Sequence, residues 1–113
     1  MENKIVLVMS IVNSGYSDKV MDLARKLGAR GGTILNASGS ASVGAEKLYG
    51  ITINPEKEVV MILISNEIVK DLLNLLYQEL GSDTEAQGIA FTLPVDEATS
   101  NLTKQINKEK KQN

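Results

Sequence analysis

The hydrophobic pattern of this chain alternates between strand-like and helix-like periods in one fixed order, and that order constrains the fold more than any other feature. Two segments with apolar residues at helical spacing end at Gly28 and Gly81. Four apolar, largely β-branched runs predict strands, at residues 4–12, 30–38, 58–65 and 88–95. The order strand, helix, strand, strand, helix, strand predicts an α+β fold of the ferredoxin-like double split βαβ type (βαββαβ), with two helices on one face of a four-stranded antiparallel sheet. The residues expected to cap the helices are Ser14 or Ser17 and Ser65 or Asn66.

The first and third predicted strands are apolar on both faces. In the first, Ile5, Leu7 and Met9 lie on one side, and Val6 and Val8 lie on the other. Because both helices of this fold cover the same face of the sheet, the second apolar face needs another cover. The 113 residues contain no further helix for that purpose, so another copy of the chain is the simplest cover. The pattern therefore predicts an oligomer.

Composition excludes several classes of function. The chain contains no His and no Cys, which rules out Ser-His-Asp and Cys-His catalysis and the zinc sites built on those residues. A formal net charge of −2 is not typical of a nucleic-acid-binding protein. We therefore expect no catalytic residues, no metal site and no nucleic-acid partner, and we expect that the protein is not an enzyme.

The two ends of the sequence give further expectations. The N-terminal residues lack the pattern of a signal peptide, and no run of about 18 apolar residues occurs, so we expect a cytoplasmic protein without direct membrane insertion. Residues 1–98 are expected to form one domain. Residues 99–113 form a basic tail, which we expect to be a frayed, soluble end. Its lysines are Lys104, Lys108, Lys110 and Lys111.

Three connecting segments separate the second, third and fourth strands. Residues 39–50 are rich in Ser, Ala and Gly up to Ala45 and show no periodicity, which predicts a flexible excursion. Its start, residues 38–42, could form a nest of backbone N–H groups for an anion, and a plain linker is an equal alternative. Residues 54–57 predict a turn, and residues 82–87 predict a polar loop.

Three stretches of the sequence resemble the P-II signalling family (nitrogen regulatory protein P-II-like). Residues 28–34, Gly-Ala-Arg-Gly-Gly-Thr-Ile, are similar to the family's entry into its second strand. Residues 55–60 are similar to its third strand and residues 88–96 to its fourth. The likeness spans roughly residues 3–98. It implies a homotrimer with adenine nucleotides (ADP, AMP or ATP) as effectors in clefts between subunits. It also implies a mobile loop, the T-loop at 39–50, that regulates a transporter or an enzyme.

The same resemblance assigns roles to individual positions. Thr33 is expected near the adenine, Leu63 in the base pocket, and Gly39 at the base of the T-loop near the phosphates. The hydroxyl and amide groups of the polar loop are expected to donate neutral hydrogen bonds to the ligand. The full set of expected ligand-binding residues is Thr33, Ser38, Gly39, Ser40, Leu63, Ser82, Thr84, Gln87, Gly88, Ile89 and Ala90.

The polar loop departs from the family pattern, which is rich in Gly and ends in Gly-Lys. Ile89 stands at the Lys position, and Asp83 and Glu85 would repel a triphosphate. A mono- or diphosphate fits this loop better, and a different ligand such as a cyclic dinucleotide is the alternative. Tyr49 lacks the sequence context of the tyrosine that some members modify, so a packed loop aromatic is the simpler interpretation.

Two further classes fit less well. Small ferredoxin-like enzymes that hydrolyse acyl phosphates need an Arg to hold phosphate, and this chain offers only Arg25, within a helix, and Arg30. A metal-binding trimer would have to use carboxylates alone. The sequence therefore favours a regulatory ligand sensor.

Overall fold

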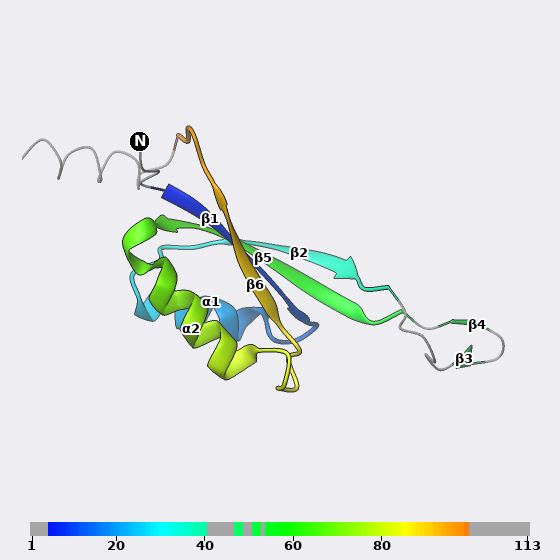
Figure 1. Ribbon diagram of the computed structural model, residues 1–113. Coiled ribbons are helices and arrows are strands. Elements are labelled where there is room, and N and C mark those ends of the chain that lie inside the picture. The colour runs from blue at the N-terminus through cyan, green and yellow to red at the C-terminus, as the bar shows by residue number, and fades with distance from the viewer. Residues whose placement is uncertain (1–4, 41–46, 49–50, 53, 100–113) are drawn as a thin grey trace, which may run out of the picture.

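A computed structural model describes residues 5–40, 47–48, 51–52 and 54–99 (Figure 1). Four antiparallel strands form one sheet in the order β2-β5-β1-β6, and α1 and α2 lie side by side on one of its faces. The predicted ferredoxin-like βαββαβ arrangement is therefore confirmed. The elements are β1 (Ile5–Asn13), α1 (Ser17–Lys26), β2 (Thr33–Ser38), β3 (Lys47–Leu48), β4 (Ile51–Thr52), β5 (Glu56–Ser65), the 3₁₀ helix η1 (Asn66–Ile68), α2 (Val69–Leu80) and β6 (Ile89–Pro94).

Several boundaries differ from the prediction. β5 begins at Glu56, inside the predicted turn 54–57, because the ladder between β2 and β5 continues to the pair Ser38–Glu56. The excursion 39–50 is not entirely irregular, since Lys47–Leu48 pairs with Ile51–Thr52 as a short antiparallel ladder. Tyr49 lies outside the described residues. Residues 96–99, which follow β6, form no helix.

The start of α1 is capped by a residue that is distant in sequence. Neither Ser14 nor Ser17 caps the helix with its side chain, so that prediction is wrong. Instead, Glu58 Oε1 accepts hydrogen bonds from the backbone N–H groups of Gly15 (2.6 Å) and Ser17 (3.4 Å). These N–H groups have no partner within the helix, and a carboxylate is the most favourable acceptor for them.

The other helix ends follow the sequence signals. Gly28 follows α1 with a φ of 107°, a left-handed conformation that glycine adopts without strain. Ser65 Oγ accepts a hydrogen bond of 3.3 Å from the backbone N–H of Glu67 and so caps η1, which directly precedes α2. α2 itself begins at Val69 without a side-chain cap. Neither described helix, at 10 and 12 residues, is long and apolar enough to cross a membrane.

The core lies between the helices and one face of the sheet. Each of the two helices contributes an apolar stripe, and the sheet positions that lie beneath them are buried. The core members from α1 are Val20, Met21, Leu23 and Ala24, those from α2 are Leu72, Leu76 and Leu80, and those from the sheet include Val8, Val12, Val60, Ile62 and Ile64.

The opposite face of the sheet, which we call the open face, is also apolar. Leu7, Met9 and Ile11 of β1 form three rows on this face with their cross-strand partners in β5 and β6. Those partners are Leu63 and Leu93, Met61 and Phe91, and Val59 and Ile89, and β2 adds Leu35 opposite Val59. No described helix covers this face (Figure 1). Leu35, Leu63, Phe91 and Leu93 are consequently 38–47% exposed and Ile89 is 61% exposed. The second apolar face predicted from the sequence is therefore present.

Candidate functional site

The two residues expected near a nucleotide base line one pocket at the β2 edge of the sheet. This pocket has a volume of about 490 Å³. Thr33 opens β2, and Leu63 lies on the open face of β5. Arg30, which the sequence analysis did not assign to the ligand, lines the same pocket and is exposed. The pocket thus combines apolar walls with the Arg30 cation and the hydroxyls of Thr33 and Ser65.

A second, polar pocket of about 380 Å³ lies where the long excursion leaves the sheet. The backbone N–H of Gly39 donates a hydrogen bond of 2.8 Å to the Pro55 carbonyl and closes the base of the excursion. Ser38 lines this pocket together with Ser14 and Lys57. Within the described part of the chain, the Lys57 ammonium forms no ion pair; its hydrogen-bond partner is the neutral side chain of Asn13. Lys57 is therefore the cation that this pocket offers to an anion, beside the Glu56 carboxylate that also lines it.

The polar loop 82–87 is organised by its own hydrogen bonds. The Thr84 hydroxyl donates to the Gly81 carbonyl at 2.8 Å, so its hydrogen is directed into the loop. Gln87 adopts a φ of 46°, in the left-handed region, and its N–H donates to the Thr84 carbonyl at 3.0 Å. A Cβ at Gly88 would collide with the Leu80 carbonyl, so this position requires glycine where the loop returns to the sheet.

The loop is attached to the rest of the chain at its acidic residue. Glu85 Oε2 accepts a hydrogen bond of 3.1 Å from the Tyr16 hydroxyl, and this bond raises the pKa of Tyr16. The Asn13 side-chain amide donates to the Glu85 carbonyl at 2.8 Å, and the Asn13 backbone N–H donates to the Ala86 carbonyl at 2.8 Å. Through Asn13, the loop is therefore linked to Lys57 at the base of the excursion.

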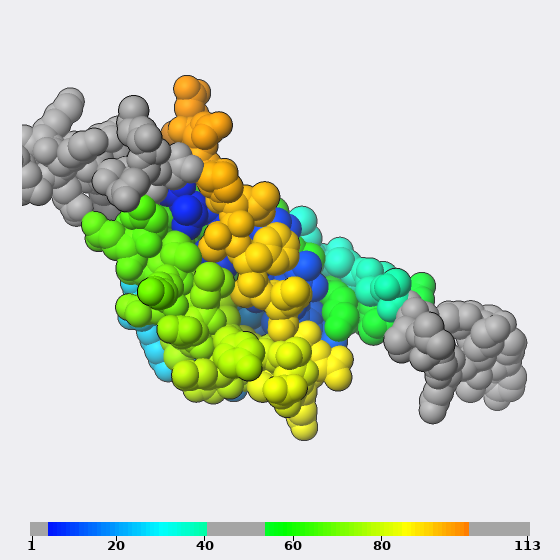
Figure 2. Space-filling model, in the orientation of Figure 1, coloured from blue at the N-terminus to red at the C-terminus, as the bar shows by residue number. Residues whose placement is uncertain are grey.

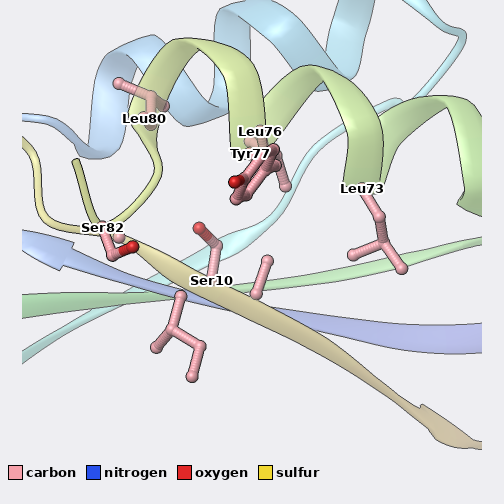
Figure 3. Close-up of a pocket in the computed structure, with 9 residues that line it drawn as sticks. Ser10, Leu73, Leu76, Tyr77, Leu80 and Ser82 are labelled. Atoms are coloured by element: carbon pink, nitrogen blue, oxygen red, sulfur yellow. The ribbon is translucent and has the colours of Figure 1, made fainter. Parts of the chain in front are cut away.

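A third pocket, the α2–β6 cavity, has a volume of about 310 Å³ (Figure 3). In Figure 2, β6 (orange to yellow) runs along the surface beside α2 (green). Four expected ligand-binding residues line this cavity, namely Ser82, Gly88, Ile89 and Ala90. Its other walls are Ser10 from β1 and apolar or aromatic side chains of α2.

The structure brings some of the expected site residues together and separates others. The end of β2, the start of β5, the end of β1 and the start of β6 share one end of the sheet, which places Ser38 and Gly39 at the same end as Gln87 and Gly88. Thr33, by contrast, is at the outer β2 edge, while Ile89 and Ala90 belong to the opposite edge strand. Ser40 is exposed and lines none of these three pockets.

Sequence reasoning missed three polar side chains in or beside these pockets. Asn13 and Lys57 follow and precede apolar strands, where polar residues are common, so neither carries a distinctive local signal. Arg30 belongs to the stretch that resembles the P-II family, but the resemblance assigned it no role. Its position directly before the pair Gly31–Gly32 is the sequence feature that could have indicated a ligand-binding role for Arg30.

No protein-family model matches the sequence, and no curated protein matches it. Comparison with solved structures does give matches, and the similarity to the three described here extends over most of the chain. A candidate PII-like signalling protein from Thermus thermophilus is 22% identical, with a TM-score of 0.62 over 84% of this chain and 91% of that one. PII of Arabidopsis thaliana bound to citrate is 22% identical, with a TM-score of 0.63 over 83% of this chain and 79% of that one. A GlnK–ATP complex of B. subtilis is 17% identical, with a TM-score of 0.63 over 84% of this chain and 86% of that one.

At this level of identity, the comparisons establish the fold. The chain has the fold of PII and PII-like signalling proteins, as its resemblance to that family implied. One of these solved structures is a complex with ATP and another is bound to citrate, so the same fold holds small anionic ligands in those proteins.

Proposed function

We propose that this protein is a divergent P-II-like signalling regulator that binds an adenine nucleotide between copies of the chain. The observation that carries the proposal is the division of the expected site between the two edges of one sheet. Thr33 and Leu63 line a pocket at the β2 edge. Gly88 directly precedes β6, which is the opposite edge strand, and lines the pocket beside it. A site split in this way becomes complete when the β6 edge of one copy adjoins the β2 edge of the next.

A closed ring of copies follows from the same arrangement, and the resemblance to the P-II family implies three copies. Contact between unlike edges is heterologous, and such contacts close into a ring when the rotation between copies allows it. In a closed ring the open faces turn inward and bury the apolar rows around Leu7, Met9 and Ile11. Burying exposed apolar area contributes about 25 cal/mol per Å², which supplies the driving force for association.

The phosphates of the nucleotide are assigned to Lys57, which lies at the end of the sheet beside the polar loop. Lys57 takes the place of the lysine that this loop lacks at Ile89. Arg30 lines the base pocket at the other end of β2. Asp83 is exposed in the same loop and opposes additional phosphate charge, so ADP or AMP is the favoured effector.

Regulation is assigned to the excursion 39–50, which would dock on a transporter or a metabolic enzyme in the cytoplasm. Its base is closed by the Gly39–Pro55 hydrogen bond, next to Lys57. A nucleotide phosphate on Lys57 would act at this base and so select among conformations of the excursion. Residues 1–98 act as the sensing domain, without catalysis.

Calorimetric titration of the purified protein with AMP, ADP, ATP and cyclic di-AMP tests the proposal. Lys57→Ala is expected to weaken ADP binding about tenfold, since charge-assisted hydrogen bonds contribute about 1.5–3 kcal/mol. Lys70→Ala, which removes an exposed lysine of α2, is the matched control and should leave the affinity unchanged. Tight binding of cyclic di-AMP with no binding of ADP would favour the alternative ligand on the same fold. Absence of binding by all four ligands would reject the proposal.

A further inference from the structure

The α2–β6 cavity exists because two small side chains are neighbours in the sheet. Ser10 of β1 pairs with Ala90 of β6 on the face that the helices cover. The neighbouring positions of β1 on that face, Val8 and Val12, carry larger side chains and are fully buried in the core. Leu73 and Leu76 of α2 lie above the small pair but do not fill the space. A cavity of about 310 Å³ remains, inside one copy of the chain.

The only hydroxyl that β1 places on this face points into the cavity. Ser10 is 2% exposed, and within the described part of the chain its side chain makes no hydrogen bond. Figure 3 shows its oxygen directed from the sheet toward Tyr77 of α2. Since the described residues contain no buried side-chain oxygen or nitrogen that lacks a partner, this oxygen is accessible from the cavity rather than sealed in the core. A bound molecule with a hydrogen-bonding group can therefore contact it.

The chemistry of the walls restricts what can bind. Among the described residues, no charged side chain lines the cavity, and most of its surface is apolar. Tyr77 is 69% exposed and borders the cavity, where its ring offers a flat apolar surface. Ser82 adds a second hydroxyl. The volume lies in the range of small-molecule sites, which combine apolar walls with a few polar groups.

We propose that the α2–β6 cavity binds a small uncharged molecule with an apolar ring or chain and one hydroxyl group, which is held by Ser10. This cavity adjoins the expected nucleotide cleft, with which it shares Ser82 and Gly88, but its described walls offer no cation to a phosphate. Ser82 and Gly88 border it and also flank the polar loop 82–87, so an occupant contacts both ends of that loop.

Phenol and toluene are matched probes, since they share an aromatic ring and differ by a hydroxyl in place of a methyl group. The full-length protein is titrated with each probe, and the amide chemical shifts are measured. Both probes should change the amide shifts of Ser10, Tyr77 and Ala90, and phenol should bind more tightly. Ser10→Ala should weaken phenol about fivefold, or about 1 kcal/mol, and change toluene less than twofold. Thr92→Ala, which removes a hydroxyl of β6 that does not line the cavity, is the control and should change neither affinity.

Filling the cavity supplies the second test. Leu73→Phe enlarges a side chain of α2 that lines it and should abolish binding of both probes. If that variant does not fold, Ser10→Val fills the same space from the sheet with a residue suited to strands. Binding of phenol that survives the filling variant, or equal affinity of phenol and toluene in the unmodified protein, would overturn the proposal. Titration of the same samples with ADP reports on the nucleotide cleft independently, so either proposal can fail while the other stands.

Discussion

Asn13 and Lys57 are paired across β1 and β5, and the Lys57 ammonium donates a hydrogen bond of 2.6 Å to the Asn13 side-chain oxygen. The amide nitrogen of the same Asn13 side chain donates to the Glu85 carbonyl at 2.8 Å. One side chain thus joins the base of the excursion to the polar loop 82–87, two segments that the sequence places far apart. A ligand that contacts either segment is therefore linked to the other by two hydrogen bonds.

Asn13→Ala removes both of these hydrogen bonds. The free energy of unfolding should fall by about 1–2 kcal/mol, because each bond contributes about 1 kcal/mol net. Amide hydrogen exchange in the loop 82–87 should become faster, and urea denaturation measures the stability change. Asn74→Ala, at an exposed position of α2, is the matched control. Unchanged exchange in the loop would show that Asn13 does not hold it.

Glu58 should make stability depend on pH. The backbone N–H of Gly15 donates a hydrogen bond to this carboxylate and is the largest cause of a pKa below the ordinary value of 4.5. Hydrogen bonds from Ser17 lower the pKa of Glu58 further. A carboxyl with a lower pKa in the folded state stabilises the protein above the unfolded pKa, and this contribution is lost as the pH falls through the folded pKa. Glu58→Gln should therefore destabilise the protein at neutral pH and reduce the loss of stability as the pH falls below the ordinary carboxyl pKa.

Thermal unfolding at several pH values measures this effect. Glu97→Gln removes an exposed carboxylate that follows β6 and serves as the control. If the two variants showed the same pH profile, the Glu58 carboxylate would have no special role at the start of α1.

Phe91→Glu should convert the assembled protein into monomers. Phe91 belongs to the open face, in one row with Met9 and Met61, and it is 39% exposed in the single chain. A carboxylate buried between copies would lose its hydration without a partner, which costs several kcal/mol. Light scattering at micromolar concentration should give three times the subunit mass for the unmodified protein. The variant should have the mass of a single subunit.

The control for assembly is Gln78→Glu, which adds the same charge at an exposed position of α2. It should retain the trimer. A monomeric unmodified protein, or a trimeric Phe91→Glu variant, would show that the open face is not the contact between copies.

Asp83 should set the preference among nucleotides. Its exposed carboxylate lies in the loop assigned to the phosphates, so ADP or AMP should bind at least as tightly as ATP. Asp83→Lys replaces repulsion with attraction and should raise the affinity for ATP relative to ADP by about tenfold, or about 1.4 kcal/mol. Calorimetry at low salt measures both affinities. A tenfold preference for ATP in the unmodified protein would contradict this account of the loop.

The sequence by itself determined the number, type and order of the main elements. Alternating apolar residues in β1 and the helical stripe of α2 report local backbone geometry, and Gly28 and Gly81 mark where the helices end. It also determined the apolar open face, because Leu7, Met9 and Ile11 alternate with the buried residues of the same strand. It did not reveal the short ladder of β3 and β4, whose two-residue strands are too brief to show a period. The ligand-binding residues remain predictions.

Only the tertiary structure decided which polar groups meet. Glu58 caps α1 from a position 43 residues beyond Gly15, and Asn13 reaches Glu85 across 72 residues. In the sequence, Ser10 is one polar residue in an apolar strand. Only the strand register places it beside Ala90, beneath α2. Hydrophobic periodicity specifies which face a residue occupies, but the partner on that face depends on strand register and helix packing. These are set by the collective burial of the whole core, so the links and the cavity could be found only in the folded chain.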